Sequence, residues 1–246
     1  MRLFGLIGFP LGHSFSKKFF EDKFLKENLN DCAFELFPLE NIFEIEKLFK
    51  NNNLQGLAVT IPYKETVIPY LTNMSVAAKE IGAVNCIKFN IEGTIGYNTD
   101  VIGFEKSLLP LLKPHHLKAL VLGTGGASKA VQFVLKKLQI DFLLVSRHSN
   151  AEKNIFSYHE IDQAMMNDYS IIINCTPLGM SPNEHELPNL PYQYITSNHL
   201  LYDLIYKPEK TMFLKEGEQR GAVIKNGFEM LVLQAEENWK IWNYKE

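Results

Sequence analysis

A glycine-rich loop in the second half of the chain has the composition of a dinucleotide-binding turn. The segment GTGGAS at 123–128 follows an apolar run typical of a β-strand and opens a run with helical periodicity. Glycine permits a tight turn and lets a diphosphate approach the backbone, while the helix N-terminus supplies N–H groups and positive potential. Ser128 replaces the third glycine of the usual pattern. A glycine turn without ligand is the alternative, but the strand, loop and helix spacing favours a nucleotide site.

The end of the next predicted strand favours NADP over NAD. An NAD site usually has an acidic residue about 20 residues after the glycines, where it bonds the ribose 2′-hydroxyl. Here the segment is Ser146-Arg147-His148, without an acid, and Asp141 stands at the wrong end of the strand. The Arg147 guanidinium can pair with a 2′-phosphate and stack on adenine. The alternative is an ordinary surface arginine.

Lys64 and Asp100 are candidates for proton transfer. Pro62 is typical of a helix start, so Lys64 is expected in a first helical turn, where the dipole should lower its pKa. Asp100 is expected at the start of another helix. A lysine and a carboxylate together can handle a proton in acid–base catalysis. A solvated lysine and a helix cap are the structural alternatives.

Three further polar residues stand at the ends of predicted elements. Ser14 and Ser16 lie where a helix should begin, and two hydroxyls at a helix N-terminus suit either capping or a bound carboxylate. Asn85 starts a strand and could bind a hydroxyl. Strand ends are where α/β sheets place ligand sites, so these residues are expected near one another.

The elements that must position these residues alternate between strand and helix. This alternation predicts an α/β protein of two domains with parallel sheets, the second domain beginning near Asp100. The polar segment 113–118 is the best linker candidate, and a last helix over 227–243 is expected to pack back on the first domain. Strands are predicted over 2–9, 32–39, 56–61, 83–89, 94–98, 170–176 and 200–206, with two more inside 118–147 and a turn at 92–93 between the fourth and fifth.

Composition excludes several classes of protein. The 246 residues carry a net charge of −3, with 46% hydrophobic and 22% charged side chains, which is typical of a globular protein and not of a nucleic-acid binder. No apolar run approaches the roughly 18 residues of a membrane helix, and the N-terminus does not read as a signal peptide. Cys32, Cys86 and Cys175 are widely spaced, so we expect free thiols, no metal site and a cytoplasmic location.

Eight short motifs in order closely resemble those of the shikimate dehydrogenase family. They are G-x-P-x-x-H-S-x-S at 8–16, V-T-I-P-x-K at 59–64, G-A-V-N at 82–85, N-T-D at 98–100, G-x-G-G-A-x-x-A at 123–130, I-N-C-T-P-x-G-M at 173–180, D-x-x-Y-x-P at 203–208 and M-L-x-x-Q-A at 230–235. The resemblance implies NADP-dependent, reversible reduction of 3-dehydroshikimate to shikimate, a small-molecule partner, and a monomer or homodimer without nucleic-acid or membrane partners. It implies a substrate domain at 1–100, a Rossmann-like NADP domain at 101–226 and a helix at 227–246 returning to the substrate domain.

The resemblance also assigns roles to individual residues. Lys64 and Asp100 match the catalytic couple, and Ser14 and Ser16 match the hydroxyls that hold the substrate carboxylate. The remaining substrate positions are Thr60, Asn85, Tyr206 and Gln234, and the cofactor positions are Gly123, Gly125, Gly126, Ala127, Arg147, Thr176, Met180, Leu204, Gly227 and Met230.

Several residues depart from the family pattern. Lys17 replaces a proline, Phe19-Phe20 replaces His-Asn, Val101 replaces a common glycine, and Ser146-Arg147-His148 replaces Asn-Arg-Thr. The first three could reshape the substrate site or mark only a lineage. The alternatives for function are a quinate/shikimate dehydrogenase that accepts NAD, and a catalytically silent dinucleotide-binding regulator that would have no reason to keep Lys64 and Asp100.

Overall fold

The computed structural model describes residues 1–12 and 14–244, and the chain divides into two compact units. The first unit consists of Met1–Thr99 with Ala235–Glu246, and the second is Asp100–Gln234. The chain leaves the first unit between Thr99 and Asp100, and it returns within the last helix, between Gln234 and Ala235. The last helix is therefore shared, and only its second half belongs with the N-terminal residues.

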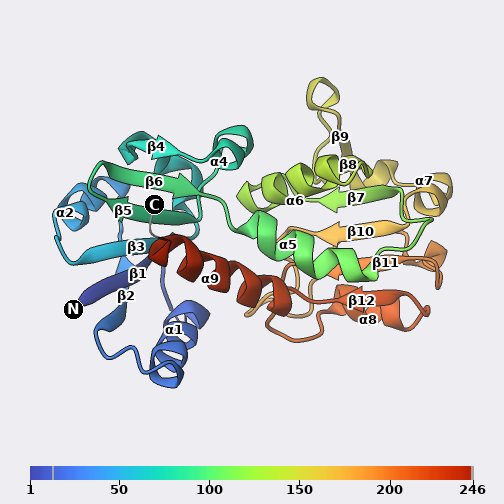
Figure 1. The fold of residues 1–246 in the computed structure, drawn as a ribbon. Coiled ribbons are helices and arrows are strands. Elements are labelled where there is room, and N and C mark those ends of the chain that lie inside the picture. The colour runs from blue at the N-terminus through green and yellow to red at the C-terminus, as the bar shows by residue number, and fades with distance from the viewer. Residues whose placement is uncertain (13, 245–246) are drawn as a thin grey trace. The chain divides into compact units, whose positions relative to one another are not determined.

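The first unit is built on a six-stranded mixed sheet in the order β2-β1-β3-β5-β6-β4 (Figure 1). Its elements are β1 (Arg2–Gly8), α1 (Phe15–Lys26), β2 (Cys32–Pro38), α2 (Ile45–Phe49), β3 (Leu54–Val59), α3 (Tyr63–Thr66), β4 (Asn73–Met74), α4 (Val76–Ile81), β5 (Cys86–Asn90) and β6 (Gly93–Tyr97). β1 is parallel to β2 and β3, whereas β5 is antiparallel to both β3 and β6. The predicted parallel pairing holds for β1 with β2 and β3, and the predicted hairpin between the fourth and fifth strands is present as β5 and β6, which makes β5 antiparallel to its neighbours. Gly93 has φ +123°, which the tight reversal requires.

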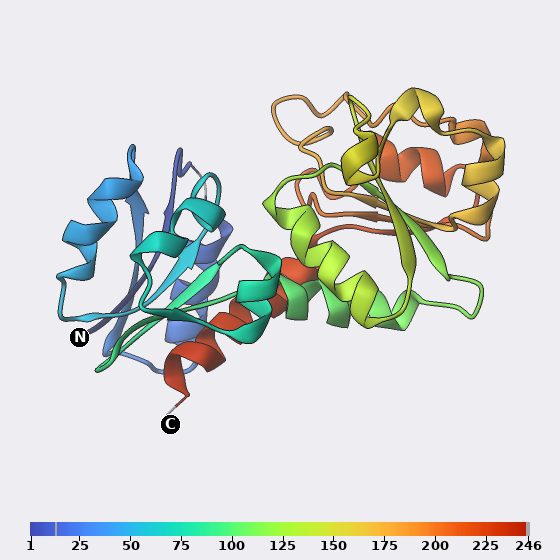
Figure 2. The same cartoon turned by 90° about the horizontal axis from the view of Figure 1, so that it is seen from above.

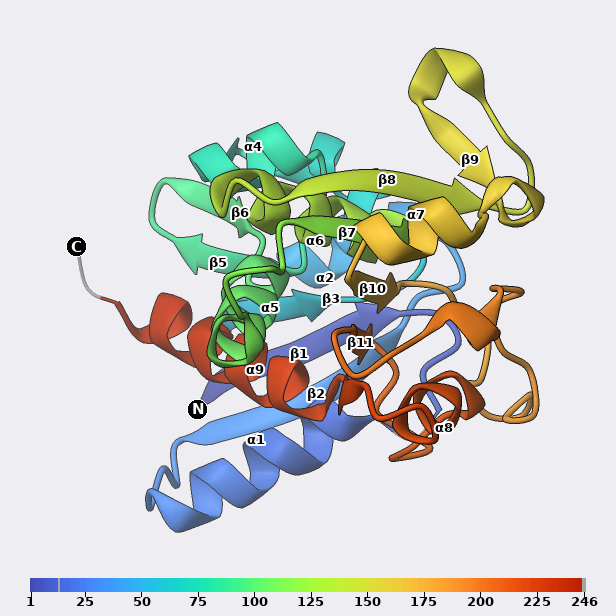
Figure 3. The same ribbon diagram turned by 90° about the vertical axis from the view of Figure 1, so that its right-hand side faces the viewer.

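An aromatic cluster covers one face of this sheet. Phe20 of α1 stacks on Phe34 of β2 with ring centroids 4.7 Å apart, so α1 lies along β2 (Figure 3). Trp242 stacks on Phe4 at 5.2 Å, and its Nε1 donates to the Ile87 carbonyl at 3.0 Å. All of these side chains are buried. The second half of the last helix is therefore tied to the first unit by ring packing and one buried hydrogen bond.

The second unit has a six-stranded, all-parallel sheet in the order β12-β11-β10-β7-β8-β9. Its elements are α5 (Asp100–Leu108), β7 (Lys118–Leu122), α6 (Gly126–Lys137), β8 (Asp141–Ser146), β9 (Ile155–Ser157), α7 (Gln163–Asp168), β10 (Ile171–Asn174), β11 (Leu200–Asp203), α8 (Met212–Glu218), β12 (Val223–Lys225) and α9 (Phe228–Asn243). Helices lie on both faces of the sheet (Figure 2). Tyr202 faces α5, where it meets Phe104 edge-on, and its neighbour Leu201 packs in the cluster that contains Phe213 of α8. This is a doubly wound, Rossmann-like arrangement.

The segment 113–118, predicted as a linker, is instead an internal connection of the second unit. His116 is only 4% exposed. Its Nδ1 accepts the Lys113 N–H at 3.1 Å, and its Nε2 lies 3.2 Å from the Asn198 carbonyl. Both ring nitrogens are thus used by the neutral imidazole, which accepts at one atom and donates at the other. Polar residues and a proline resemble a linker locally, but contacts with a distant part of the chain bury His116 in the middle of this segment.

His116 should make the second unit less stable in mild acid. Burial, His115, Lys113 and His199 all lower the pKa of His116, and the Asn198 carbonyl raises it. The unfolded chain therefore binds a proton more readily than the folded chain as the pH falls below about 6.5. In urea unfolding between pH 7.5 and 5.5, we expect the wild-type protein to lose up to about 1.4 kcal/mol per pH unit more than His116→Gln. Parallel pH profiles for the two proteins would contradict this expectation.

The described residues form no membrane-spanning helix, no cluster of metal ligands and no disulfide. No helix there is long and apolar enough to cross a membrane. No group of three His, Cys, Asp or Glu side chains among those residues could hold a metal ion. Cys32, Cys86 and Cys175 are free thiols, of which Cys86 is buried.

Candidate functional site

The glycine loop after β7 has the geometry of an anion-binding turn. Gly123 has φ +102°, a conformation that favours glycine, and a Cβ there would be crowded at 3.1 Å from Thr176 Cγ2. Gly125 caps α6, and a Cβ on it would meet nothing within 4 Å. The first turn of α6, which contains Gly126 and Ala127, has no acidic side chain. An anion can therefore approach open backbone N–H groups at the positive end of a 12-residue helix.

Ser128, which replaces the third glycine of the usual pattern, stabilises this turn through its side chain. Its side chain is fully buried, and both its N–H and its Oγ donate to the Gly125 carbonyl at 3.0 Å. The hydroxyl also accepts a hydrogen bond from Gln132 Nε2 at 3.2 Å. The Ser128 hydroxyl thus adds a second hydrogen bond to the Gly125 carbonyl, whereas a glycine at this position could donate only its backbone N–H.

Arg147 directly follows β8, and β8 pairs with β7, the strand that leads into the glycine loop. Val145 pairs with Leu122, and its carbonyl accepts the Gly123 N–H at 2.7 Å, so Arg147 follows two residues after a direct contact with the loop. The Arg147 side chain is exposed. Among the described residues it has no hydrogen-bond or ion-pair partner, so its guanidinium is available to an anionic ligand. Asp141 lies at the opposite end of β8, as expected.

The segments after β10 and β11 are held by a buried network that the sequence analysis missed. Asp203 is fully buried and accepts hydrogen bonds from Thr211 Oγ1 at 2.6 Å, Ile205 N at 3.0 Å and Asn174 Nδ2 at 3.1 Å. Asn174 Oδ1 in turn accepts both the Thr176 N–H and the Thr176 hydroxyl. Burial raises the pKa of Asp203 to about 6, so the carboxyl is ionised at neutral pH, as three donors require. Asp203 and Asn174 belong to the motifs that suggested the family, but their spacing alone does not reveal that they anchor loops.

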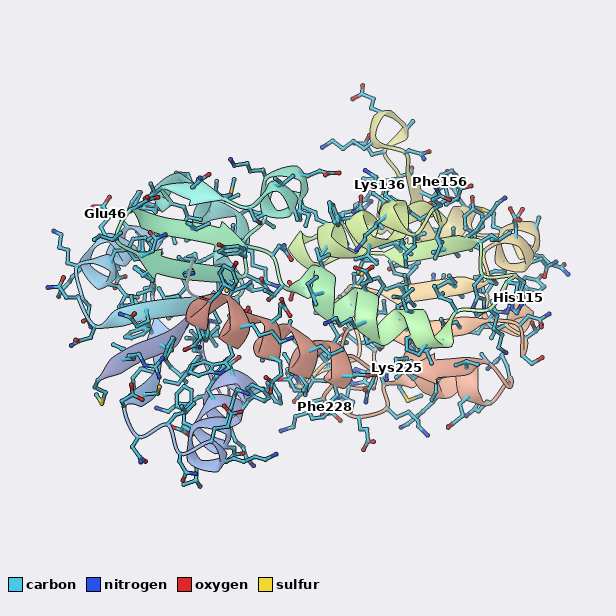
Figure 4. The ribbon with its side chains drawn as sticks, in the orientation of Figure 1. Glu46, His115, Lys136, Phe156, Lys225 and Phe228 are labelled. Atoms are coloured by element: carbon cyan, nitrogen blue, oxygen red, sulfur yellow. The ribbon has the colours of Figure 1, made fainter. Side chains whose placement is uncertain are left out.

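The other candidate cofactor residues gather around these segments. A Cβ on Gly227 would lie 2.0 Å from the Leu204 carbonyl oxygen, so this close approach admits only glycine. Gly227 lies in the short connection between Lys225, the last residue of β12, and Phe228, the first residue of α9, both labelled in Figure 4. Met230 is buried, as is usual for methionine, whereas Met180 is 47% exposed and accessible to a ligand.

Hydrogen bonds to backbone groups bring the candidate catalytic and substrate residues of the first unit close together. The Lys64 carbonyl accepts the Val84 N–H at 2.7 Å, and Asn85 Oδ1 accepts the Thr99 N–H at 2.6 Å. Thr60 follows β3, whose last residue, Val59, donates its N–H to the Asn85 carbonyl at 2.8 Å. Thr60, Lys64 and Asn85 therefore lie together beside Thr99, the residue that directly precedes Asp100.

Lys64 and Asp100 stand at helix starts, as predicted. Lys64 is the second residue of α3, and Asp100 is the first residue of α5 and is buried. However, α3 has only four residues. A helix of one turn has a small macrodipole, so the electrostatic effect expected at Lys64 is weaker than the sequence pattern suggested.

Ser14 and Ser16 begin α1 after the loop that follows β1. Ser14 is the N-cap, and its Oγ accepts the Lys17 N–H at a long 3.5 Å, so it caps weakly. The Phe9 N–H on the same loop donates to the Ile61 carbonyl at 3.1 Å, which brings the start of this loop beside Thr60. His13 of the same motif lies outside the described residues.

Tyr206 and Gln234 belong to the second unit. Tyr206 is 36% exposed just beyond β11, and burial of part of its ring raises the pKa of its hydroxyl. Gln234 is buried on α9 and donates from Nε2 to the Leu231 carbonyl at 2.9 Å.

The departures from the family pattern in α1 have packing roles. Lys17 pairs with Glu35 of β2 at 2.9 Å. Phe20 is fully buried in the aromatic cluster, and Phe19 meets it edge-on with centroids 5.1 Å apart. Val101 is 4% exposed, within the core. Lys17 and Phe20 are therefore explained by the packing of α1 on β2.

Comparisons with known proteins agree on one family. The family model of the shikimate dehydrogenase substrate binding domain matches residues 6–87. A shikimate dehydrogenase (NADP(+)) of Clostridium botulinum is 36% identical, covering 97% of this chain and 95% of that protein. The Aquifex aeolicus shikimate dehydrogenase structure has a TM-score of 0.87 at 36% identity and covers 98% of this chain and 92% of that one. The Thermus thermophilus shikimate 5-dehydrogenase, solved with NADP(H) and shikimate, has a TM-score of 0.86 at 25% identity, covering 99% and 94%.

Proposed function

Because this chain belongs to the shikimate dehydrogenase family, we propose that it is an NADP-dependent oxidoreductase that interconverts shikimate and 3-dehydroshikimate. The names of its relatives support the reaction and the cofactor. The observation that carries the proposal is the pair of hydrogen bonds from Val84 N–H to the Lys64 carbonyl and from Thr99 N–H to Asn85 Oδ1, because they gather the candidate residues of the first unit beside Thr99, which directly precedes Asp100 in sequence. The first unit would supply Lys64 and most of the substrate residues, and the second unit would supply the cofactor residues together with Asp100, Tyr206 and Gln234.

The residues of the second unit fit NADP. The turn at Gly123, Gly125, Gly126 and Ala127 suits a diphosphate, and Arg147, which has no ion-pair partner within residues 1–12 and 14–244, suits a 2′-phosphate. When bound, the nicotinamide supplies or accepts the hydride. The residues proposed along the adenosine and nicotinamide path are Thr176, Met180, Leu204, Gly227 and Met230.

Substrate would be held by hydroxyl, amide and charged groups. Ser14 and Ser16 would bind its carboxylate at the start of α1. Thr60, Asn85, Tyr206 and Gln234 would bind its ring hydroxyls. During ketone reduction, Lys64 would donate to or polarise the carbonyl oxygen, and Asp100 would hold the substrate hydroxyl and the lysine in register. In the reverse direction the hydroxyl proton would leave through the same couple.

The reaction is tested by absorbance at 340 nm with purified protein, shikimate or quinate, and NADP⁺ or NAD⁺. We expect rapid NADPH formation from shikimate. A preference for quinate or NAD⁺ would favour the quinate/shikimate alternative and overturn the substrate or cofactor assignment. Tight NADPH binding without turnover would favour the silent regulator.

Arg147→Ala should relax the choice of cofactor. A charge-assisted hydrogen bond to a phosphate is worth about 1.5–3 kcal/mol, so KM for NADP⁺ should rise about 10- to 100-fold while KM for NAD⁺ changes little. Lys153→Ala is the matched control, because Lys153 is an exposed cation in the same loop region after β8. Steady-state kinetics with both cofactors measures the effect. An equal rise for both cofactors would show that Arg147 does not recognise the 2′-phosphate.

A further inference from the structure

The tyrosine next to the proposed catalytic lysine ties the helix of that lysine to a distant part of the first unit. Tyr63 is the first residue of α3, and Lys64 is the second. The Tyr63 side chain is buried, and its hydroxyl donates to the Leu39 carbonyl at 2.5 Å, across 24 positions of sequence. Tyr63 fills the unspecified position of the V-T-I-P-x-K motif at 59–64, so the motif assigns it no role. We infer that Tyr63 is a positioning residue that holds Lys64 in place for the reaction.

The direction of this hydrogen bond follows from the chemistry of its two groups. A carbonyl oxygen can only accept, so the single proton of the Tyr63 hydroxyl is donated to Leu39. Burial raises the pKa of Tyr63, and the carboxylates of Glu44 and Glu40 raise it further. The hydroxyl therefore keeps its proton, and the hydrogen bond its donor, at neutral pH.

The helix α3 needs an anchor of this kind because it is short and weakly capped. It has only four residues, and its N-cap residue, Pro62, makes no side-chain hydrogen bond. One helical turn is not stable by itself in water. Two long-range hydrogen bonds connect α3 to other elements, from the Val84 N–H to the Lys64 carbonyl at 2.7 Å and from the Tyr63 hydroxyl to Leu39. The first fixes the backbone of the lysine, and the second fixes the residue directly before it.

The Leu39 acceptor is itself held by the sheet. Leu39 directly follows β2, and its N–H donates to the carbonyl of Gly8, the last residue of β1, at 3.2 Å. The last residues of β1 and β2 are paired in a parallel ladder. The Tyr63 hydrogen bond therefore ties α3 to the ends of two paired strands. The loop after β1 leads to Ser14 and Ser16, so the proposed lysine and the proposed carboxylate-binding hydroxyls share one support.

This inference rests on the proposed function, because Lys64 is a catalytic residue only there. Tyr63 packs in the same apolar cluster as Leu39 and Val67, so Tyr63→Phe keeps the ring contacts and removes only the hydroxyl. A catalytic group displaced by about 1 Å can cost about 10²-fold in rate, so we expect Tyr63→Phe to lower kcat for shikimate oxidation about 3- to 30-fold. KM for NADP⁺ should change less than about twofold, because the candidate cofactor residues belong to the second unit.

A double-mutant cycle with Lys64→Ala distinguishes positioning from a purely structural role. If Tyr63 acts through the lysine, Tyr63→Phe should cause no further loss of kcat in the Lys64→Ala background. Tyr70→Phe is the matched control and should keep the wild-type kcat. Tyr70 packs against the same apolar cluster, and its hydroxyl makes no hydrogen bond within the described part of the chain. Tyr63→p-aminophenylalanine keeps a weaker N–H donor on the same ring, so its kcat should lie between those of Tyr63→Phe and wild type.

The outcomes separate this inference from the proposed function. If wild type oxidises shikimate and Tyr63→Phe loses thermal stability but keeps its kcat, Tyr63 is structural and the inference is overturned. An additive loss of kcat in the double variant would also overturn it. If Tyr63→Phe does not fold, a wild-type kcat in Tyr63→p-aminophenylalanine would have the same meaning. If wild type does not turn over shikimate, the proposed function fails and this inference fails with it.

Discussion

Lys64→Ala is expected to lower kcat for shikimate oxidation about 10²- to 10⁴-fold, the usual contribution of a positioned acid or base. The lysine backbone should stay in place, because its carbonyl bond to Val84 N does not involve the side chain. The glycine loop and Arg147 lie in the other unit, so NADPH affinity should change little. Stopped-flow or steady-state absorbance at 340 nm measures turnover, and NADPH fluorescence measures binding.

Lys79→Ala is the matched control for this variant. Lys79 is an exposed lysine on α4 of the same unit, outside the proposed site. We expect it to keep wild-type kinetics and stability. If wild type is active and Lys64→Ala turns over equally fast, Lys64 has no role in the mechanism. Asp100 would then be the remaining candidate for proton transfer.

Trp242→Ala is expected to lower the free energy of unfolding by about 3–5 kcal/mol, the usual cost of removing a large buried aromatic ring. Trp242 is 6% exposed and packs on Phe4 and Phe20. It also fills the space above Gly56, where a Cβ would lie 2.3 Å from its ring. Its loss leaves a cavity and removes the hydrogen bond to Ile87, so the second half of α9 should detach most readily.

Urea unfolding measures this effect, with Leu25→Ala as control. Leu25 lies on α1 near the same cluster in sequence but is 82% exposed, so its loss should change stability by less than about 0.5 kcal/mol. Similar stabilities for Trp242→Ala and wild type would mean that the C-terminal helix does not depend on the aromatic cluster. Hydrogen exchange at residues 235–243 would locate the detachment.

The local features of the molecule were predictable from the residues alone. The glycine loop, the helix after it and the arginine beyond the next strand follow from spacing, because a strand, a tight turn and a helix N-terminus form from neighbouring residues. The same holds for α1, α9 and the four central strands β7, β8, β10 and β11 of the second sheet, whereas the short edge strands β9 and β12 were not predicted. The family followed from several such local motifs in order, and the comparisons confirm it.

Other features depend on residues that are far apart in sequence. The mixed order of the first sheet is set by which strands β5 and β6 find as neighbours, and the buried His116 lies against the Asn198 carbonyl, 82 positions away. The role of Asp203 requires Asn174 and Thr211.

Phe20 illustrates the difference most clearly. From the sequence, its departure from the family pattern was compatible with either a reshaped substrate site or a lineage difference, and contact with Phe34 places it in the core. Periodicity and turn chemistry act over a few residues, so a sequence reveals them directly. The partner of a buried polar or aromatic side chain is chosen by the packing of whole elements, and only the folded chain brings those partners within contact distance.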